Sequence, residues 1–252
     1  MILGVEVPPI SHVTIWGAGP LGINKTAVIY GFATLATIML FWLGTRKKDA
    51  LVPSGFFQNT AESGVAFVRN QIIMSTMGSD GLRFLPYLTA LFFFLFFSNI
   101  TEIIPAVQFP ANARIAMPMV FALVTWFLYN IVGIVKQGPL KYLKNSTIPP
   151  GVPVAILPLV MVIEFVSNFL VRPFSLMVRL FANMLAGHLI LVTFAALCAG
   201  LWAAKVTVII VLPTFGLLVA MTGFEILVSF LQAFIFAILT AVYIGSSMHP
   251  DH

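Results

Sequence analysis

Charged side chains are scarce in this 252-residue chain, at 8% of the sequence against about 25% in an ordinary soluble domain. Apolar types make up 60% of the residues and the mean hydropathy is +1.04. A soluble globular fold could not bury so much apolar surface, so that class is excluded. The few charges also separate uncharged stretches long enough to cross a bilayer, for which about 20 residues suffice. The composition therefore predicts a polytopic membrane protein built from α-helices.

Cysteine is nearly absent as well. The single Cys198 excludes an intramolecular disulfide framework and a four-thiolate metal site. Three of the four histidines are near the ends of the chain, so His188 has no second histidine at membrane depth for a haem or copper site. Since no phosphate loop and no HExxH pair occurs either, we expect no cofactor and no catalysis by this chain alone.

The formal net charge of +5 comes from basic residues scattered at predicted membrane edges. They form no tract with exposed aromatics, so the charge favours contact with lipid headgroups and not with nucleic acid.

The first 20 residues have no positively charged n-region and contain three prolines, unlike a cleaved signal peptide. Insertion is therefore expected to depend on the internal spans.

Hydropathy predicts one membrane domain, residues 1–252, with about five crossing helices. The last segment would reach roughly 65 Å as one straight helix, about twice the hydrocarbon thickness, so it either doubles back or is steeply tilted. Pro213, Gly216 and Gly223 are possible breaks. The predicted parts are an extracytoplasmic N-terminus at 1–25, a first span at 26–44, a helical hairpin at 84–104 and 115–135, and two long segments at 151–204 and 206–248.

Residues 56–78 are too polar to span, but apolar residues from Phe57 to Ile72 recur at helical spacing. This pattern predicts an amphipathic helix at the cytoplasmic membrane surface, or equally a helix packed on the rest of the protein.

The orientation of the chain in the membrane follows from its basic residues. With the N-terminus outside and five crossings, eight Lys and Arg fall on the inside and three on the outside. The positive-inside bias therefore predicts an extracytoplasmic N-terminus and a cytoplasmic C-terminus.

Ionisable groups at membrane depth are costly and are usually functional. Four of those in the predicted spans are candidates for a function: Glu164, Arg179, His188 and Glu225. Arg179 is the most informative, because a guanidinium stays protonated and its charge must be paired or used. Either it forms a fixed salt bridge with Glu164 or Glu225, or it meets a charge on another polypeptide.

Helical spacing describes the surroundings of these groups. Small or weakly polar residues share the face of Arg179, which suits close approach of another helix; they are Ser175, Ala182, Asn183 and Ala186. His188 is on the opposite side of the same helix, as a packing residue or as a proton relay that titrates near neutral pH. Glu225 and Gln232, seven residues apart, form a polar stripe that either lines a cavity or holds helices together.

The segment Arg179-Leu-Phe-Ala-Asn183-Met-Leu-Ala-Gly-His188 resembles the signature of subunit a of F-type ATP synthases. Three other segments agree: Arg172-Pro-Phe-Ser175, the stretch from Glu225 through Gln232 to Tyr243, and Phe97-Ser-Asn-Ile-Thr-Glu-Ile-Ile-Pro105. The resemblance covers about Phe84 to Tyr243 and is most specific in its last third. The Met-rich and Phe-rich composition favours a bacterial member of the family, of the actinobacterial kind.

The resemblance implies a fold and a function. The last two segments would form a long, tilted hairpin around a rotating ring of c subunits, in a bacterial plasma membrane. The chain would be the stator subunit of the membrane Fo sector, with two aqueous proton half-channels coupling proton flow to ring rotation and ATP synthesis. Its expected partners are the c-ring, peripheral-stalk b-type subunits, the lipid bilayer and the translocated protons, with no nucleic acid.

The resemblance also implies residue roles. Arg179 would face the ring carboxylate, with Asn183 and Gln232 beside it and Ser175 one turn before it. His188 and Glu225 would be an interacting pair in the outer half-channel. Glu164 would be an acid of the cytoplasmic half-channel.

Two alternatives use the same buried charges. A proton-coupled secondary transporter or ion channel would have internal repeats and a substrate cavity, and the sequence contains no such repeat. An intramembrane hydrolase with His188 and Glu225 as acid and base would need a nucleophile motif, which the sequence lacks.

Overall fold

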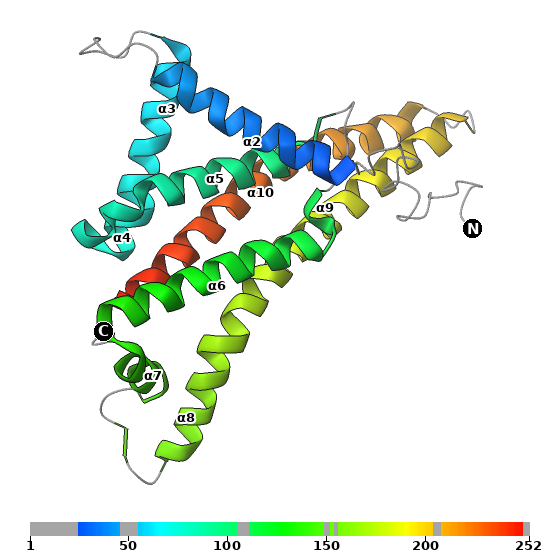
Figure 1. The fold of residues 1–252 in the computed structure, drawn as a ribbon. Coiled ribbons are helices and arrows are strands. Elements are labelled where there is room, and N and C mark those ends of the chain that lie inside the picture. The colour runs from blue at the N-terminus through cyan, green and yellow to red at the C-terminus, as the bar shows by residue number, and fades with distance from the viewer. Residues whose placement is uncertain are drawn as a thin grey trace, which may run out of the picture.

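The computed structural model describes residues 25–45, 55–104, 111–148, 152–153, 156–203 and 208–248. All regular structure in these ranges is helical (Figure 1). Most of the expected N-terminal segment, residues 1–24, lies outside them. The α-helices are α2 (Lys25–Gly44), α3 (Phe56–Phe67), α4 (Met74–Thr76), α5 (Leu85–Ile100), α6 (Ala116–Gln137), α7 (Pro139–Thr147), α8 (Leu157–Val166), α9 (Arg172–Ala203) and α10 (Val208–Met248).

Five helical stretches in the described ranges are long and apolar enough to cross a membrane. The expectation of an all-α protein with about five crossings is therefore confirmed. The stretches are Thr26–Gly44, Gly78–Ile100, Ala116–Gln137, Leu157–Trp202 and Ile210–Met248.

The two C-terminal stretches are long and unbroken. α10 runs for 41 residues with Pro213 inside it, so this segment does not double back. Before it, α8 leads into α9 through the π-helical turn Ser167–Val171. This turn ends two residues before Pro173, which lacks an N–H and crowds the preceding turn, so wider local winding is expected there.

The first of these stretches begins later than the sequence predicted. Within the expected segment 151–204, residues 152–153 are not helical and α8 begins at Leu157. Pro158 stands in the first turn of α8. A proline is well tolerated there, because the first turn has no intrahelical use for its missing N–H. The start of this helical stretch, predicted from apolar character alone, was therefore placed too early.

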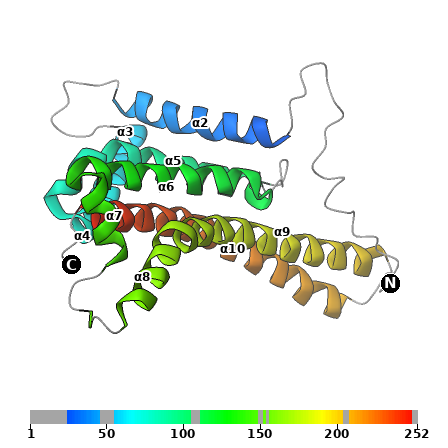
Figure 2. The same cartoon turned by 60° about the horizontal axis from the view of Figure 1, so that its bottom comes forward.

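The helices form three layers, which Figure 2 shows most clearly: α2 on one side, α5 with α6 in the middle, and α9 with α10 on the other side. α10 packs on α5, α6 and α9. Ala233, Ala237 and Ala241 recur at every fourth position of α10 and are completely buried. Small residues at this spacing let helix backbones approach closely, so the C-terminal half of α10 is the centre of the bundle.

The helical stretch after residue 55 packs on protein. Ala61, Val68 and Ile72 of the predicted apolar stripe are buried, whereas Phe57 is half exposed. α3 contacts α2 and α5, and the π-helical turn Val68–Ile73 contacts α5 and α10. The alternative of a helix packed on the protein thus describes most of this stripe. Its contact with the membrane surface stays a prediction.

The basic segment after α6, whose composition is that of a linker, forms helix α7 (Pro139–Thr147). It starts after Gly138, whose φ of 83° is a conformation that favours glycine. The Tyr142 hydroxyl donates a hydrogen bond to Asn130 Oδ1 at 3.0 Å, and its ring occupies the space where a side chain at Gly133 would lie. One buried tyrosine therefore anchors α7 on α6, a feature that the linker-like composition did not predict.

Candidate functional site

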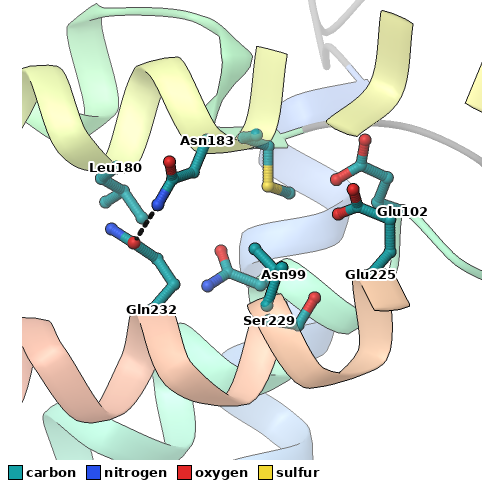
Figure 3. A pocket seen from close by; sticks show the side chains of 9 residues that line it. Asn99, Glu102, Leu180, Asn183, Glu225, Ser229 and Gln232 are labelled. Carbon is teal, nitrogen blue, oxygen red and sulfur yellow. Dashed lines mark hydrogen bonds between the residues drawn. The ribbon is translucent and has the colours of Figure 1, made fainter. Parts of the chain in front are cut away.

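A polar pocket lies between the end of α5 and the facing sides of α9 and α10 (Figure 3). It encloses about 220 Å³, including the part that opens to the outside. Six of its nine lining residues are polar or acidic, an unusual concentration for membrane depth. The lining residues are Asn99, Glu102, Leu180, Asn183, Met184, Glu225, Val228, Ser229 and Gln232.

Three residues predicted from the sequence meet in this pocket: Asn183, Glu225 and Gln232. The Asn183 amide donates to Gln232 Oε1 at 2.7 Å, joining α9 to α10 (Figure 3). Gln232 is buried whereas Asn183 is exposed. The bond therefore connects the interior of the pocket to the outer face of α9.

Glu225 approaches α9 at a glycine. A Cβ atom added at Gly187 would lie 2.5 to 2.6 Å from the carboxylate atoms of Glu225, closer than real atoms come. The missing side chain at residue 187 thus makes room for the carboxylate. Within the described ranges, Glu225 forms no ion pair.

His188 is paired with a different acid from the one expected. Its Nδ1 lies 3.5 Å from Oε1 of Glu102, and both side chains are buried. Glu102 belongs to the turn directly after α5, and its carboxylate lies beside that of Glu225 at one end of the pocket (Figure 3). Glu225 instead packs against Gly187, the neighbour of His188. The two carboxylates and the imidazole therefore form one cluster, in which Glu102 provides the close contact.

Arg179 lies on the other side of α9. It is partly buried, and in the part of the chain that the structure describes it forms no hydrogen bond or ion pair. The salt bridge to Glu164 or Glu225 that the sequence left open is therefore not formed. Leu176 and Leu180 are buried in the bundle, while residues on the Arg179 side, including Ala182 and Ala186, are exposed. Arg179 thus belongs to a face of α9 on which the small residues are exposed.

Ser175 and Glu164 lie outside the pocket. Ser175 is partly exposed, one turn before Arg179 on the same face of α9. Glu164 is roughly 22 Å before Arg179 along the helix, and its Oε2 accepts a 3.4 Å bond from the Asn168 amide. The hydroxyl of Tyr129 donates to the carbonyl of Asn168 at 2.7 Å, which ties this region to α6.

Sequence reasoning did not assign Glu102, Asn99 and Ser229 to the site. A signal for Glu102 was present, since it is the one acid in the predicted span 84–104 and belongs to the segment Phe97–Pro105. Asn99 and Ser229 gave no signal beyond polarity. No group of three or more His, Cys, Asp or Glu side chains in the described ranges is placed to hold a metal ion.

Comparison with known proteins gives consistent matches. Residues 27–245 match a family described as "ATP synthase A chain". The ATP synthase subunit a of Frankia alni is 43% identical over 238 residues, 94% of this chain and 81% of that protein. The one from Rhodococcus erythropolis is 42% identical over 237 residues (93% and 86%). The one from Rhodopseudomonas palustris strain HaA2 is 44% identical over 225 residues (88% and 87%).

Proposed function

This chain belongs to the ATP synthase A chain family, and from this membership we propose that it is the proton-conducting stator subunit of the membrane Fo sector. It is a multi-pass membrane component of an ATP synthase. The alternative of a secondary transporter or ion channel finds no support in the comparisons. The chain performs no chemistry alone and needs no cofactor. Its N-terminus is extracytoplasmic and its C-terminus cytoplasmic, in a bacterial plasma membrane.

Arg179 acts on the carboxylates of the c-ring. A carboxylate in a lipid environment stays protonated because burial disfavours its charged form. A cation at about 4 Å favours the ionised form by roughly 4 kcal/mol, if the effective dielectric constant is near 20. A ring carboxylate that arrives at Arg179 therefore gives up its proton. The observation that carries this proposal is a partly buried Arg179 with no partner in the described part of its own chain, on a face of small exposed residues.

The polar pocket forms part of the outer half-channel. It contains two buried amide nitrogens without a hydrogen-bond partner among the described residues, Asn99 Nδ2 and Gln232 Nε2, and Glu102 Oε1, which contacts His188 Nδ1 at 3.5 Å without a hydrogen bond. Buried polar atoms of this kind are usually satisfied by ordered water. Water in the pocket would connect the cluster of Glu102, His188 and Glu225 to the Asn183–Gln232 bond. Protons would follow this route to the ring beside Arg179.

The second half-channel lies toward the cytoplasm, along Glu164 and Ser175. The fixed charge of Arg179 repels a hydrated proton, so protons cannot pass directly from one half-channel to the other. They travel around on the ring instead. One charge crossing the membrane yields about 2.3 kcal/mol per 100 mV, so several transfers must be added by rotation to support one ATP. The c-ring and b-type peripheral-stalk subunits are therefore the partners of this chain.

Replacement of Arg179 tests this function. We expect Arg179→Ala to abolish ATP-driven proton pumping in inverted membrane vesicles, while the complex still copurifies with its ring of small subunits. Arg179→Lys should restore little, because a buried ammonium can lose its proton whereas a guanidinium cannot. The matched control is Arg69→Ala, at an exposed position of the helical segment after α3. Normal pumping by an assembled Arg179→Ala complex would refute the proposal.

A further inference from the structure

A chain of buried hydrogen bonds leads from α2 to the pocket. The Tyr30 hydroxyl, on α2, donates to Asn112 Oδ1 at 2.6 Å. The Asn112 amide in turn donates to Asn99 Oδ1 at 2.7 Å. All three side chains are buried, but only Asn99 lines the pocket. The chain therefore joins the outermost layer of the bundle (Figure 2) to the wall of the site.

The order of donors and acceptors along this chain is defined. An amide carbonyl oxygen can only accept hydrogen bonds, and an amide nitrogen can only donate them. Asn112 Nδ2 also lies 3.4 Å from the Ser98 hydroxyl oxygen. That hydroxyl already donates its hydrogen to the carbonyl of Leu95 at 3.0 Å, so it can only accept from Asn112. Asn112 must therefore present its nitrogen to Ser98 and Asn99, and its oxygen to Tyr30.

This order determines which end of Asn99 faces the pocket. Because Asn99 Oδ1 is occupied by Asn112, its Nδ2 is left without a partner in the described part of the chain, with the residue only 1% exposed. Figure 3 shows the Asn99 amide between Gln232 and the two carboxylates, Glu102 and Glu225. With the amide reversed, Asn99 would present a carbonyl oxygen, and a water molecule would have to donate to it instead of accepting from it. Asn99 thus presents its Nδ2 amide group to the pocket as a hydrogen-bond donor.

We propose that Tyr30 and Asn112 are positioning residues that hold Asn99 as a fixed hydrogen-bond donor to the pocket. The inference rests on the proposed function, since it concerns the same proton route. A water molecule that accepts from Asn99 directs its own hydrogens toward acceptors that line the same pocket, which include Glu102 and Glu225. The bonds therefore orient water for transfer to these carboxylates. α2, which does not line the pocket, influences proton flow through this connection.

Removing one hydroxyl tests the connection. Tyr30→Phe frees Asn112 and Asn99 to turn over, and we expect proton flux per assembled complex to fall about fivefold. That fold-change corresponds to about 1 kcal/mol, at 1.4 kcal/mol per tenfold. Asn99→Leu removes the donor itself and should lower flux at least as much. Asn99→Gln keeps an amide donor and should retain more flux than Asn99→Leu.

The matched control is Tyr142→Phe. Tyr142 also donates a buried hydrogen bond to an asparagine, Asn130, but neither residue lines the pocket. Its loss should lower thermal stability by an amount similar to that of Tyr30→Phe and leave flux per assembled complex unchanged. Flux is measured as ATP-driven acidification by the purified whole complex in liposomes, normalised to the amount of assembled ring.

A double-mutant cycle gives the decisive result. If Tyr30 acts through Asn99, Tyr30→Phe has no further effect on flux in the Asn99→Leu background. If Tyr30→Phe lowers flux by the same factor in both backgrounds, or in neither, the inference is overturned. Arg179→Ala in the same preparation keeps the two proposals separate. An inactive Arg179→Ala with an additive cycle refutes only the positioning role, whereas a normally pumping Arg179→Ala refutes the proposed function.

Discussion

A methyl group added at Gly187 should displace the Glu225 carboxylate without unfolding the protein. The new Cβ would lie 2.5 Å from Oε2 and 2.6 Å from Oε1 and Cδ. Non-bonded heavy atoms prefer separations near 3.5 Å, so the carboxylate must move by about 1 Å. It is the far end of a flexible side chain, and glycine in a helix interior is about 1 kcal/mol less favourable than alanine. We therefore expect Gly187→Ala to assemble with little loss of stability.

The displaced carboxylate should nevertheless slow proton transfer. A misplacement of about 1 Å in a reacting group can lower a rate by about a hundredfold. We expect ATP-driven proton pumping by Gly187→Ala to fall tenfold to a hundredfold in vesicles. Adding Glu225→Asp, which shortens the acid by one methylene group, should relieve the overlap and restore part of the flux.

Gly31→Ala is the matched control for this prediction. Gly31 also lies inside a helix, and nothing lies within 4 Å of a Cβ added there. This variant gains the same helix propensity without displacing a side chain, so its pumping should be normal. If Gly187→Ala pumps as fast as Gly31→Ala at equal assembly, the reasoning about the close approach of Glu225 to α9 is refuted.

Two further changes test other parts of the structure. His188→Leu should slow proton flux, because leucine can neither accept nor donate a proton; an unchanged rate would mean that His188 only packs against Glu102. Arg172→Gln should lower the melting temperature of the purified complex, since the Arg172 guanidinium carbon lies 5.0 Å from the ring centroid of Tyr243 and such a contact contributes about 1 kcal/mol. The control is Lys144→Gln, at an exposed position, which should leave the melting temperature unchanged. An equal decrease in melting temperature for Arg172→Gln and Lys144→Gln would contradict a stabilising contact between Arg172 and Tyr243.

Much of the site could be predicted because its residues are costly in a membrane. Arg179, His188 and Glu225 stood out as charged or titratable groups inside apolar stretches, and the spacing between Glu225 and Gln232 placed both on one helical face. The surrounding segments carried the resemblance to the family, which the comparisons confirmed. The partner of His188 was not predicted. Glu102 and His188 are far apart in the sequence, so their contact depends on how α5 and α9 pack.

Short elements were the least predictable. α7 is basic and ends close to two prolines, so its composition resembles that of a linker. Its helix depends on one long-range contact, in which Tyr142 packs at Gly133 and bonds to Asn130. In the same way, the apolar stripe after Phe57 is compatible with lipid or protein as its neighbour. The structure resolves this ambiguity for Val68 and Ile72, which are buried.

Some properties of this protein follow from its sequence alone. The number of crossing segments and the presence of an arginine at membrane depth depend on the order of apolar and charged residues, because bilayer thickness and the cost of a buried charge act on each segment separately. Only the tertiary structure decides whether the face of α9 that carries Arg179 is exposed, which acid contacts His188, and which end of the Asn99 amide reaches the pocket. These depend on how far each helix is rotated and shifted against its neighbours, which is determined by packing among segments distant in the chain.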